Sequence, residues 1–278
     1  MLLLLSSLAA LLGGSLCGLV GYYVYKLQMV TLSFCVAHAA LAGAALALVA
    51  GLDPMPIAMA SATLAALLLG ALGSGEHARE LASMAVFSAS SAVALLAIYV
   101  ANTRVLATAS LAAVLWGSVL AVTPAKLVAL SLTTALFLFY VSAYRVHVDA
   151  MLYDAKLAEA EGLRVRMHEL AMLLFAGAAI ASTLKLTGGF LIFSLLYNPV
   201  AASIQLTRSA HAQRSFAPAL GASSALAGLA ASYALDLPVG ASIAIASSAV
   251  LLAFCLVRWL YDKRAAERAS RATIGPYT

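Results

Sequence analysis

Charged residues are scarce in this chain. Asp, Glu, Lys and Arg make up only 10% of its 278 residues, whereas 64% are hydrophobic. Soluble domains carry about 25% charged residues, so this chain cannot cover a surface that faces water. Apolar stretches of about 20 residues cross the hydrocarbon core of a bilayer as helices. The composition therefore predicts an all-α integral membrane protein without a sizeable soluble domain.

Catalytic and disulfide patterns are also missing. The three cysteines, Cys17, Cys35 and Cys255, lie in apolar segments, and their odd number and spacing argue against a disulfide framework. No G-x-x-x-x-G-K-[ST] motif is present, so the chain has no phosphate-binding loop of that kind. No Ser/His/Asp or Cys/His arrangement is evident. We therefore expect no enzyme activity, and any ATP-driven step needs another polypeptide.

Long apolar runs, separated by charges and by Pro or Gly, predict a bundle of about nine transmembrane helices. The further apolar run Val105–Val122 is interrupted by Trp116-Gly117-Ser118, and we expect a re-entrant or interfacial piece there. The first run has no basic start and is too long for a signal peptide. The predicted spans are Leu2–Tyr25, Met29–Ala50, Pro56–Gly73, Leu81–Ala101, Lys126–Tyr144, His168–Leu186, Gly189–Leu206, Phe216–Ala234 and Val239–Leu260.

The net charge of +5 comes from short polar segments between these runs and from the C-terminus. Basic residues gather on cytoplasmic loops of membrane proteins. We therefore expect one membrane domain over residues 1–278, with a cytoplasmic loop at 145–167 and a basic cytoplasmic tail at 261–278. The segments GLDPMP and LDLPVG would face outside, although Arg104 and Lys126 do not fit this rule. The charge pattern indicates a multi-pass protein of the cell membrane among lipids, without a nucleic-acid partner.

The loop at 145–167 contains the stretch DAKLAEAEGL, which reads as a short helix. Asp154 is a good N-cap, the following residues are helix formers, and Gly162 suits the position after the helix end. A helix with such defined ends favours docking against a partner on the cytoplasmic side. A solvated linker is the alternative.

Six segments, in order along nearly the whole chain, resemble the permease family of ABC-type metal importers. The first is similar to the family pattern G-D-A-L-S-H-A-x-L-P-G, and the fourth to F-D-P-E-L-A-R-A-x-G-L. The six segments are SFCVAHAALAG, EHARELASMAVFSASSAVALLAI, VLWGSVLAVTPAKL, YDAKLAEAEGLRVR, TGGFLIFSLLYNPVAASIQLTRS and SYALDLPVGASIAI.

The resemblance implies a type II ABC importer-like fold and the import of a divalent transition metal, zinc or manganese first and iron as a possibility. It also implies a homodimer or heterodimer of permeases, cytoplasmic ATPase subunits and an extracytoplasmic metal-binding protein. The ion is the transported substrate, and no permanently bound cofactor is expected. Asp154–Leu163 would be the coupling helix. Its residues that fit the family pattern include Asp154, Leu157, Ala158, Gly162 and Leu163.

The family aspartate and histidine of the opening segment are implied to line the ion path. His38 matches the histidine, but Phe34 stands where the aspartate should be, so the path lacks that carboxylate. Cys35 lies three residues before His38 and can share its helix face, where thiolate and imidazole would suit zinc. Each residue also has a simpler interpretation, Cys35 as a small buried hydrophobe and His38 as a packing histidine.

Asn198 and Pro199 lie within a predicted span, where the proline frees a backbone carbonyl that another group must satisfy. They are candidates for the translocation path, with a simple helix kink as the alternative. Because the aspartate is missing, two other functions stay open. The chain could import another substrate, such as a metal chelate, or be a degenerate paralogue that keeps the ATPase contact without transporting.

Overall fold

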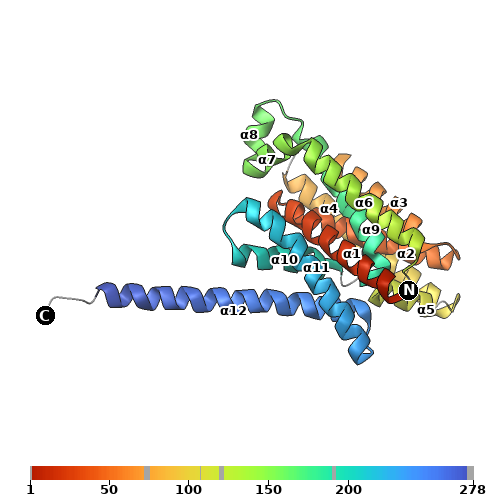
Figure 1. Ribbon diagram of the computed structural model, residues 1–278. Helices are drawn as coiled ribbons and strands as arrows, with labels where there is room; N and C mark the ends of the chain where they lie inside the picture. The colour runs from red at the N-terminus through yellow and green to blue at the C-terminus, as the bar shows by residue number, and fades with distance from the viewer. Residues whose placement is uncertain (1, 72–75, 107, 119–121, 190–191, 274–278) are drawn as a thin grey trace.

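The computed structural model describes residues 2–71, 76–106, 108–118, 122–189 and 192–273, and the regular elements of these residues are helices (Figure 1). The elements are α1 (Leu2–Lys26), α2 (Val30–Val49), α3 (Pro54–Ala71), α4 (Glu76–Thr103), α5 (Thr108–Trp116), α6 (Pro124–Ala143), α7 (Arg145–Tyr153), α8 (Ala155–Ala160), α9 (Val165–Thr187), α10 (Ile192–Leu206), α11 (Ala210–Leu235) and α12 (Val239–Thr273).

Eight of these helices are long and apolar enough to cross a membrane, and the shorter α10, Ile192–Leu206, is apolar as well. The predicted spans agree with these helices to within a few residues at most ends. The predicted end at Gly73 lies outside the described part of the chain, as do residues 190–191 of the predicted span Gly189–Leu206. The prediction of a polytopic helical membrane protein with about nine spans is therefore confirmed.

The run Val105–Val122 contains only α5, a helix of 9 residues, in its described part. At about 1.5 Å per residue, such a helix covers less than half of a bilayer core of roughly 30 Å. The N–H of Gly189 donates to the carbonyl of Val114 over 2.8 Å, so α5 packs beside the C-terminal end of α9. In its described part, the run forms a helix too short to cross a membrane, in agreement with the sequence, which predicts no full span there.

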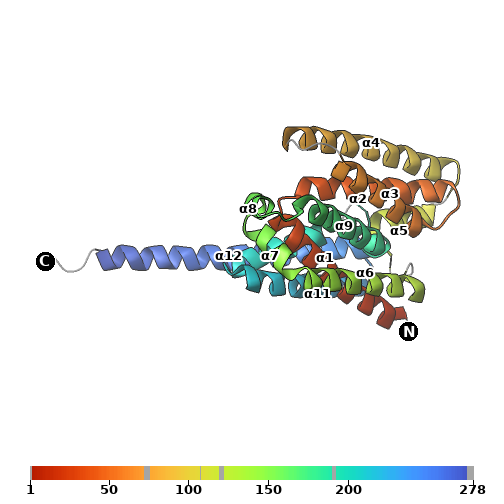
Figure 2. The same ribbon diagram turned by 90° about the horizontal axis from the view of Figure 1, so that it is seen from above.

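Among the eight candidate spans, helix α2 is the most deeply buried, because 78% of its apolar core stretch lies inside the bundle. It packs against α3, α4 and α9, while α1 packs against α11. In the view of Figure 2, α4 lies at one edge beside α2 and α3, and α6 and α11 lie on the opposite side. Gly14 of α1 and Gly221 of α11 bring their backbones so close that a Cβ on either glycine would overlap the other's carbonyl. Close backbone approach of this kind is how small residues hold helices together in lipid.

Side-chain contacts identify which helix ends lie together. The Tyr22 hydroxyl donates to the Ala210 carbonyl over 2.9 Å, joining the end of α1 to the start of α11. The Arg166 guanidinium donates to the Gly70 carbonyl over 3.0 and 2.7 Å, joining the start of α9 to the end of α3. α7 and α8 lie at this same end (Figure 1). The clustering of basic residues here supports the expected cytoplasmic orientation of this end.

Two segments differ from the sequence expectations in extent. Helix α11 begins at Ala210 instead of Phe216, because the Ser209 hydroxyl caps it by accepting from the N–H of Ala212. Residues 261–273 continue α12 rather than forming a separate tail, and α12 projects well beyond the bundle (Figure 1). These residues are mostly Ala, Arg, Lys and Glu, which favour helix. Residues 274–278 of the predicted tail lie outside the described range.

Candidate functional sites within the membrane and at its cytoplasmic end

His38 lies in α2 and faces both α4 and α10. Its ring meets the ring of Phe87 from α4 nearly edge-on, with centroids 4.4 Å apart. Its other face lies near Phe193 of α10, with centroids 5.7 Å apart and planes inclined by 18°. The imidazole is therefore held between aromatic rings from two neighbouring helices.

The hydrogen bond of His38 determines which ring nitrogen is free. Nδ1 lies 3.0 Å from the backbone carbonyl of Phe34. A carbonyl can only accept, so Nδ1 carries the proton and Nε2 keeps a bare lone pair in the neutral ring. This tautomer, with one nitrogen oriented by a backbone carbonyl, is the arrangement that prepares imidazole for a metal. His38 thus offers one nitrogen ligand within a membrane span.

Phe34, which the resemblance places at the position of the family aspartate, joins α2 to α10. Its ring stacks on Phe193 with centroids 3.9 Å apart and lies within 5.7 Å of the Tyr197 ring. The Tyr197 hydroxyl is hydrogen-bonded to the hydroxyl of Ser33, one residue before Phe34. Where a charged side chain is expected, the structure has an aromatic contact between two helices.

Cys35 shares the face of His38 toward α4, as the three-residue spacing predicts. Its side chain is 1% exposed, and the thiol is positioned to donate to the carbonyls of Thr31 at 3.2 Å and Ser83 at 3.0 Å. Within the part of the chain that the structure describes, no three His, Cys, Asp or Glu side chains gather to hold a metal. Cys35 is placed as a buried thiol donor, and its role as a ligand stays a prediction.

Asn198 and Pro199 lie where α10 faces α12. The Asn198 amide donates to the hydroxyls of Ser247 at 3.1 Å and Ser248 at 3.0 Å. Pro199 is buried inside α10, which continues across it. These contacts give Asn198 a packing function between helices, and its place on a translocation path stays a prediction.

The aromatic partners of His38 were not selected from the sequence. Phe193 and Tyr197 are spaced four residues apart in α10, so they share one helix face. That spacing was a usable signal for an aromatic face. Its pairing with α2 and with Phe87 of α4 depends on tertiary packing, which the spacing does not specify.

The predicted coupling helix is present as α8. The Asp154 carboxylate accepts from the N–H groups of Lys156 at 2.9 Å and Leu157 at 3.0 Å, as an N-cap does. At the other end, the N–H of Gly162 donates to Glu159 and that of Leu163 to Ala158, each over 3.0 Å. Gly162 has φ +90°, which completes a Schellman motif. Both predicted ends of this helix are thus observed.

One face of α8 is buried within the chain and another is open. Ala158 is 2% exposed and packs with Met151 of α7 and Val165 of α9. In contrast, Leu157 of α8 is 50% exposed, and Tyr153, the last residue of α7, is 87% exposed. Ala158 therefore fixes α8 on its own chain, and the apolar residues available to a partner are Leu157 and Tyr153.

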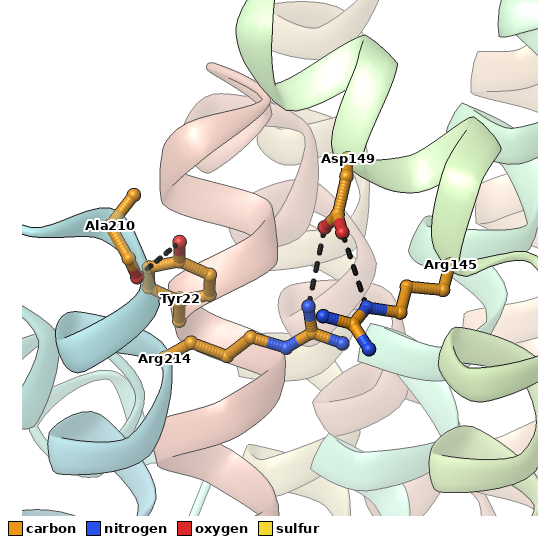
Figure 3. A network of polar contacts seen from close by, with 5 residues as sticks. All are labelled: Tyr22, Arg145, Asp149, Ala210 and Arg214. Atoms are coloured by element: carbon orange, nitrogen blue, oxygen red, sulfur yellow. Dashed lines mark hydrogen bonds and ion pairs between the residues drawn. The ribbon is translucent and has the colours of Figure 1, made fainter.

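Asp149 connects α7, which leads into α8, to the membrane helices. Its carboxylate lies between two guanidinium groups, Arg145 Nε at 3.5 Å and Arg214 Nη1 at 3.2 Å (Figure 3). The Arg214 guanidinium also lies over the Tyr23 ring of α1, 5.3 Å from its centroid. This network links the segment before α8 to α1 and α11. Arg145 and Asp149 are four residues apart, but Arg214 lies 65 positions from Asp149, so the full network cannot be predicted from sequence spacing.

A polytopic helical bundle with a capped surface helix between spans defines a membrane permease of the type II ABC importer kind. The chain belongs to the ABC 3 transport family, whose model matches residues 2–258. This confirms the resemblance of the six segments to ABC-type metal importer permeases. The chain is the multi-pass membrane subunit, and ATP hydrolysis takes place in a separate subunit.

Three similar proteins illustrate the relationship. A "Manganese transport system membrane protein MntC" from Halalkalibacterium halodurans is 30% identical over 274 residues, covering 94% of this chain and 92% of that protein. A "Probable iron transport system membrane protein" from Haemophilus influenzae is 27% identical, covering 90% and 93%. The structure of PsaBC from Streptococcus pneumoniae in complex with Fab superposes with a TM-score of 0.78 at 22% identity, covering 91% of each chain. This last similarity concerns the fold.

Proposed function

We propose that this chain imports a divalent transition-metal ion and that zinc is preferred over manganese and iron. An extracytoplasmic metal-binding protein delivers the ion, and two permeases, alike or different, work on two cytoplasmic ATPase subunits. Family membership and relatives named for manganese and iron transport support a transition metal. The ligand chemistry of the chain itself supports zinc.

The free Nε2 of His38 is the observation that carries this proposal. An ionisable group inside a membrane span is costly and rare, which makes it a candidate for the transport path. Its Nδ1 is oriented by the Phe34 carbonyl, so in the neutral ring Nε2 is the nitrogen that offers a lone pair to an ion. A histidine needed only for packing would gain nothing from this free nitrogen.

Zinc is favoured because the hard ligand of the family pattern is missing. Manganese prefers carboxylate, carbonyl and water oxygens, whereas imidazole nitrogen suits zinc. Phe34 replaces the aspartate that would supply oxygen, and its ring stacks on Phe193. Zinc also binds more tightly than manganese to a given nitrogen site in the divalent series. With His38 as the fixed ligand, selectivity should shift from manganese toward zinc.

The exposed apolar side chains on and beside α8 support the proposal that this helix couples the chain to the ATPase. The side chains of Leu157 and Tyr153 are exposed, whereas Ala158 is buried and packs α8 against its own chain. Exposed apolar groups on a rigid, capped element are suited to docking into a groove of another protein. We expect α8 to move with the ATPase and to pass its displacement to α7, α9 and the membrane helices.

Uptake by proteoliposomes holding the assembled transporter tests the ion site. His38→Ala and His38→Gln should both lose uptake of radiolabelled zinc, since glutamine can restore a hydrogen bond but binds metal poorly. The matched control is His168→Gln, because His168 uses Nδ1 to contact the Tyr140 hydroxyl at 2.6 Å. Zinc uptake should persist in this control. Normal zinc uptake by His38→Gln would show that His38 only packs and that the ion passes elsewhere.

Import of a metal chelate is the second candidate, and the aromatic face of Phe34, Phe193 and Tyr197 favours it. Flat apolar rings contact organic ligands better than they contact a bare ion. The same proteoliposomes distinguish the two, because chelate import predicts that free zinc is not taken up and that both His38 variants transport the chelate as well as the unchanged chain does. ATPase stimulation without uptake of either substrate would instead indicate the non-transporting paralogue.

A further inference from the structure

A cavity of about 620 Å³ lies between α1, α6 and α11, away from His38. It follows α1 from Ser15 to Tyr23, a rise of about 12 Å at 1.5 Å per residue. That distance is close to half of a bilayer core of roughly 30 Å. The cavity therefore extends from near the membrane centre to the end of the bundle where α7 begins.

The inner part of this cavity is apolar in character. Leu16, Leu19 and Leu138 line it. Two hydroxyls at the same depth are already satisfied by their own helices, since Ser15 donates to the Leu12 carbonyl at 3.0 Å and Thr134 to the Leu130 carbonyl at 2.8 Å. These hydroxyls need no polar ligand, so the wall suits a hydrocarbon chain.

The outer part of the cavity is basic. Arg145 and Arg214 line it, together with His211. Both guanidinium groups reach toward the single carboxylate of Asp149 and lie close to each other (Figure 3). Each guanidinium has five N–H donors, and only one from each approaches Asp149 in these ion pairs. Two positive charges against one negative charge leave an excess of positive charge and free donors.

This charge excludes the cavity as an ion path, because two guanidinium groups repel a divalent cation. A ligand with an anionic head and an apolar chain matches both parts of the cavity. Its volume falls within the range of about 300–1,000 Å³ that small-molecule sites occupy. Basic pockets between membrane helices on the cytoplasmic side bind anionic lipid head groups. We propose that this cavity binds an anionic glycerophospholipid of the cytoplasmic leaflet, its phosphate on Arg145 and Arg214 and one acyl chain against Leu16, Leu19 and Leu138.

Such a lipid lies beside the Asp149 network that links α7 to α11. Its phosphate bonds to both arginines and so adds a second bridge between the segment before α8 and the start of α11. The lipid therefore stabilises the seating of the coupling helix. This function concerns the membrane environment and does not depend on which ion is transported.

Native mass spectrometry of the full-length protein, titrated in detergent with phosphatidylglycerol or with phosphatidylcholine of the same acyl chains, tests the proposal. We expect retention of phosphatidylglycerol in preference to phosphatidylcholine. The double variant Arg145→Gln/Arg214→Gln should weaken phosphatidylglycerol binding by about tenfold or more. Arg208→Gln is the matched control, because Arg208 is exposed at the same end of the bundle but does not line the cavity.

Leu138→Trp keeps both arginines and fills the apolar part, so it should also lower phosphatidylglycerol binding. This variant serves if the arginine variant fails to fold. Equal binding of the two lipids would overturn the proposal. Two results together would also overturn the proposal: displacement of phosphatidylglycerol by inorganic phosphate, and normal binding of phosphatidylglycerol by Leu138→Trp. The site would then take a free anion. A disulfide between two copies of Ser142→Cys would show a second copy of the chain in the cavity and overturn it too.

Discussion

The His38 region among the membrane helices and the α8 region at one end of the bundle differ in how they resemble the permeases of ABC-type metal importers. The α8 region matches the family pattern at Asp154, Leu157 and Gly162 but has Ala155 and Lys156 where proline and glutamate are usual, and its two ends have the predicted caps. The His38 region keeps the histidine but replaces the carboxylate by Phe34, which stacks against α10. The α8 region thus has the capped helix that the sequence predicts, whereas the His38 region has an aromatic contact between helices where the resemblance implies a carboxylate.

We expect the largest effect from a change in the His38 region that abolishes zinc uptake and leaves the association with the ATPase intact. His38→Ala removes the proposed nitrogen ligand, and loss of a metal ligand should cost at least the roughly 10–100-fold that loss of a supporting group costs. Zinc uptake by the assembled transporter should fall accordingly, while ATPase subunits still co-purify with the variant. Loss of ATPase association in His38→Ala would contradict the independence of the two regions.

Gly162→Val should change the α8 region and leave the His38 region intact. Gly162 has φ +90°, where a side chain strains the backbone by roughly 1–2 kcal/mol, and valine is β-branched. The end of α8 should distort, and stimulation of ATP hydrolysis by the permease should fall several-fold. Gly51→Val is the control, because Gly51 has φ +70° with open space around it at the other end of the bundle. Equal loss of ATPase stimulation in both variants would argue against a specific function of α8.

Phe34→Asp restores the carboxylate of the family pattern and should have a smaller, directional effect. An oxygen ligand beside His38 favours manganese, so the ratio of manganese to zinc uptake should rise several-fold. Competition between the two labelled ions in the same proteoliposomes measures this ratio. Phe34→Leu removes the ring without adding a ligand and serves as the control. An unchanged ratio in Phe34→Asp would place the selectivity outside the His38 region.

Asp149→Asn should have the smallest effect. Its two ion pairs are partly exposed, and such pairs contribute about 0.2–1 kcal/mol each. We expect stable assembly but more ATP hydrolysed per ion, because α7 is less firmly attached to α11. Asp262→Asn breaks a similar exposed pair with Arg258 in α12 and should leave this ratio unchanged. A fully coupled Asp149→Asn transporter would show that the network does not transmit motion.

Much of the fold could be predicted from the sequence because its determinants are local. Apolar length specifies a span wherever the backbone must satisfy its own hydrogen bonds in lipid. The ends of α8 follow from Asp154 and Gly162, whose effects reach only a few residues. The start of α11 was less predictable. Ser209 caps α11 through a single hydrogen bond, so helix formation begins before the apolar run at Phe216.

The candidate site was only partly predictable. The sequence was enough to predict a charge-poor helical membrane protein with His38 in a span, and its resemblance to metal-importer permeases implies an aspartate where Phe34 stands. Tertiary structure alone decided that Phe87 and Phe193 enclose His38, and that Asp149 meets Arg214 across 65 positions of the chain. Helix propensity and hydropathy act between near neighbours in sequence. The partners of these side chains depend on how whole helices pack, as where Gly14 of α1 and Gly221 of α11 let their two helices approach closely.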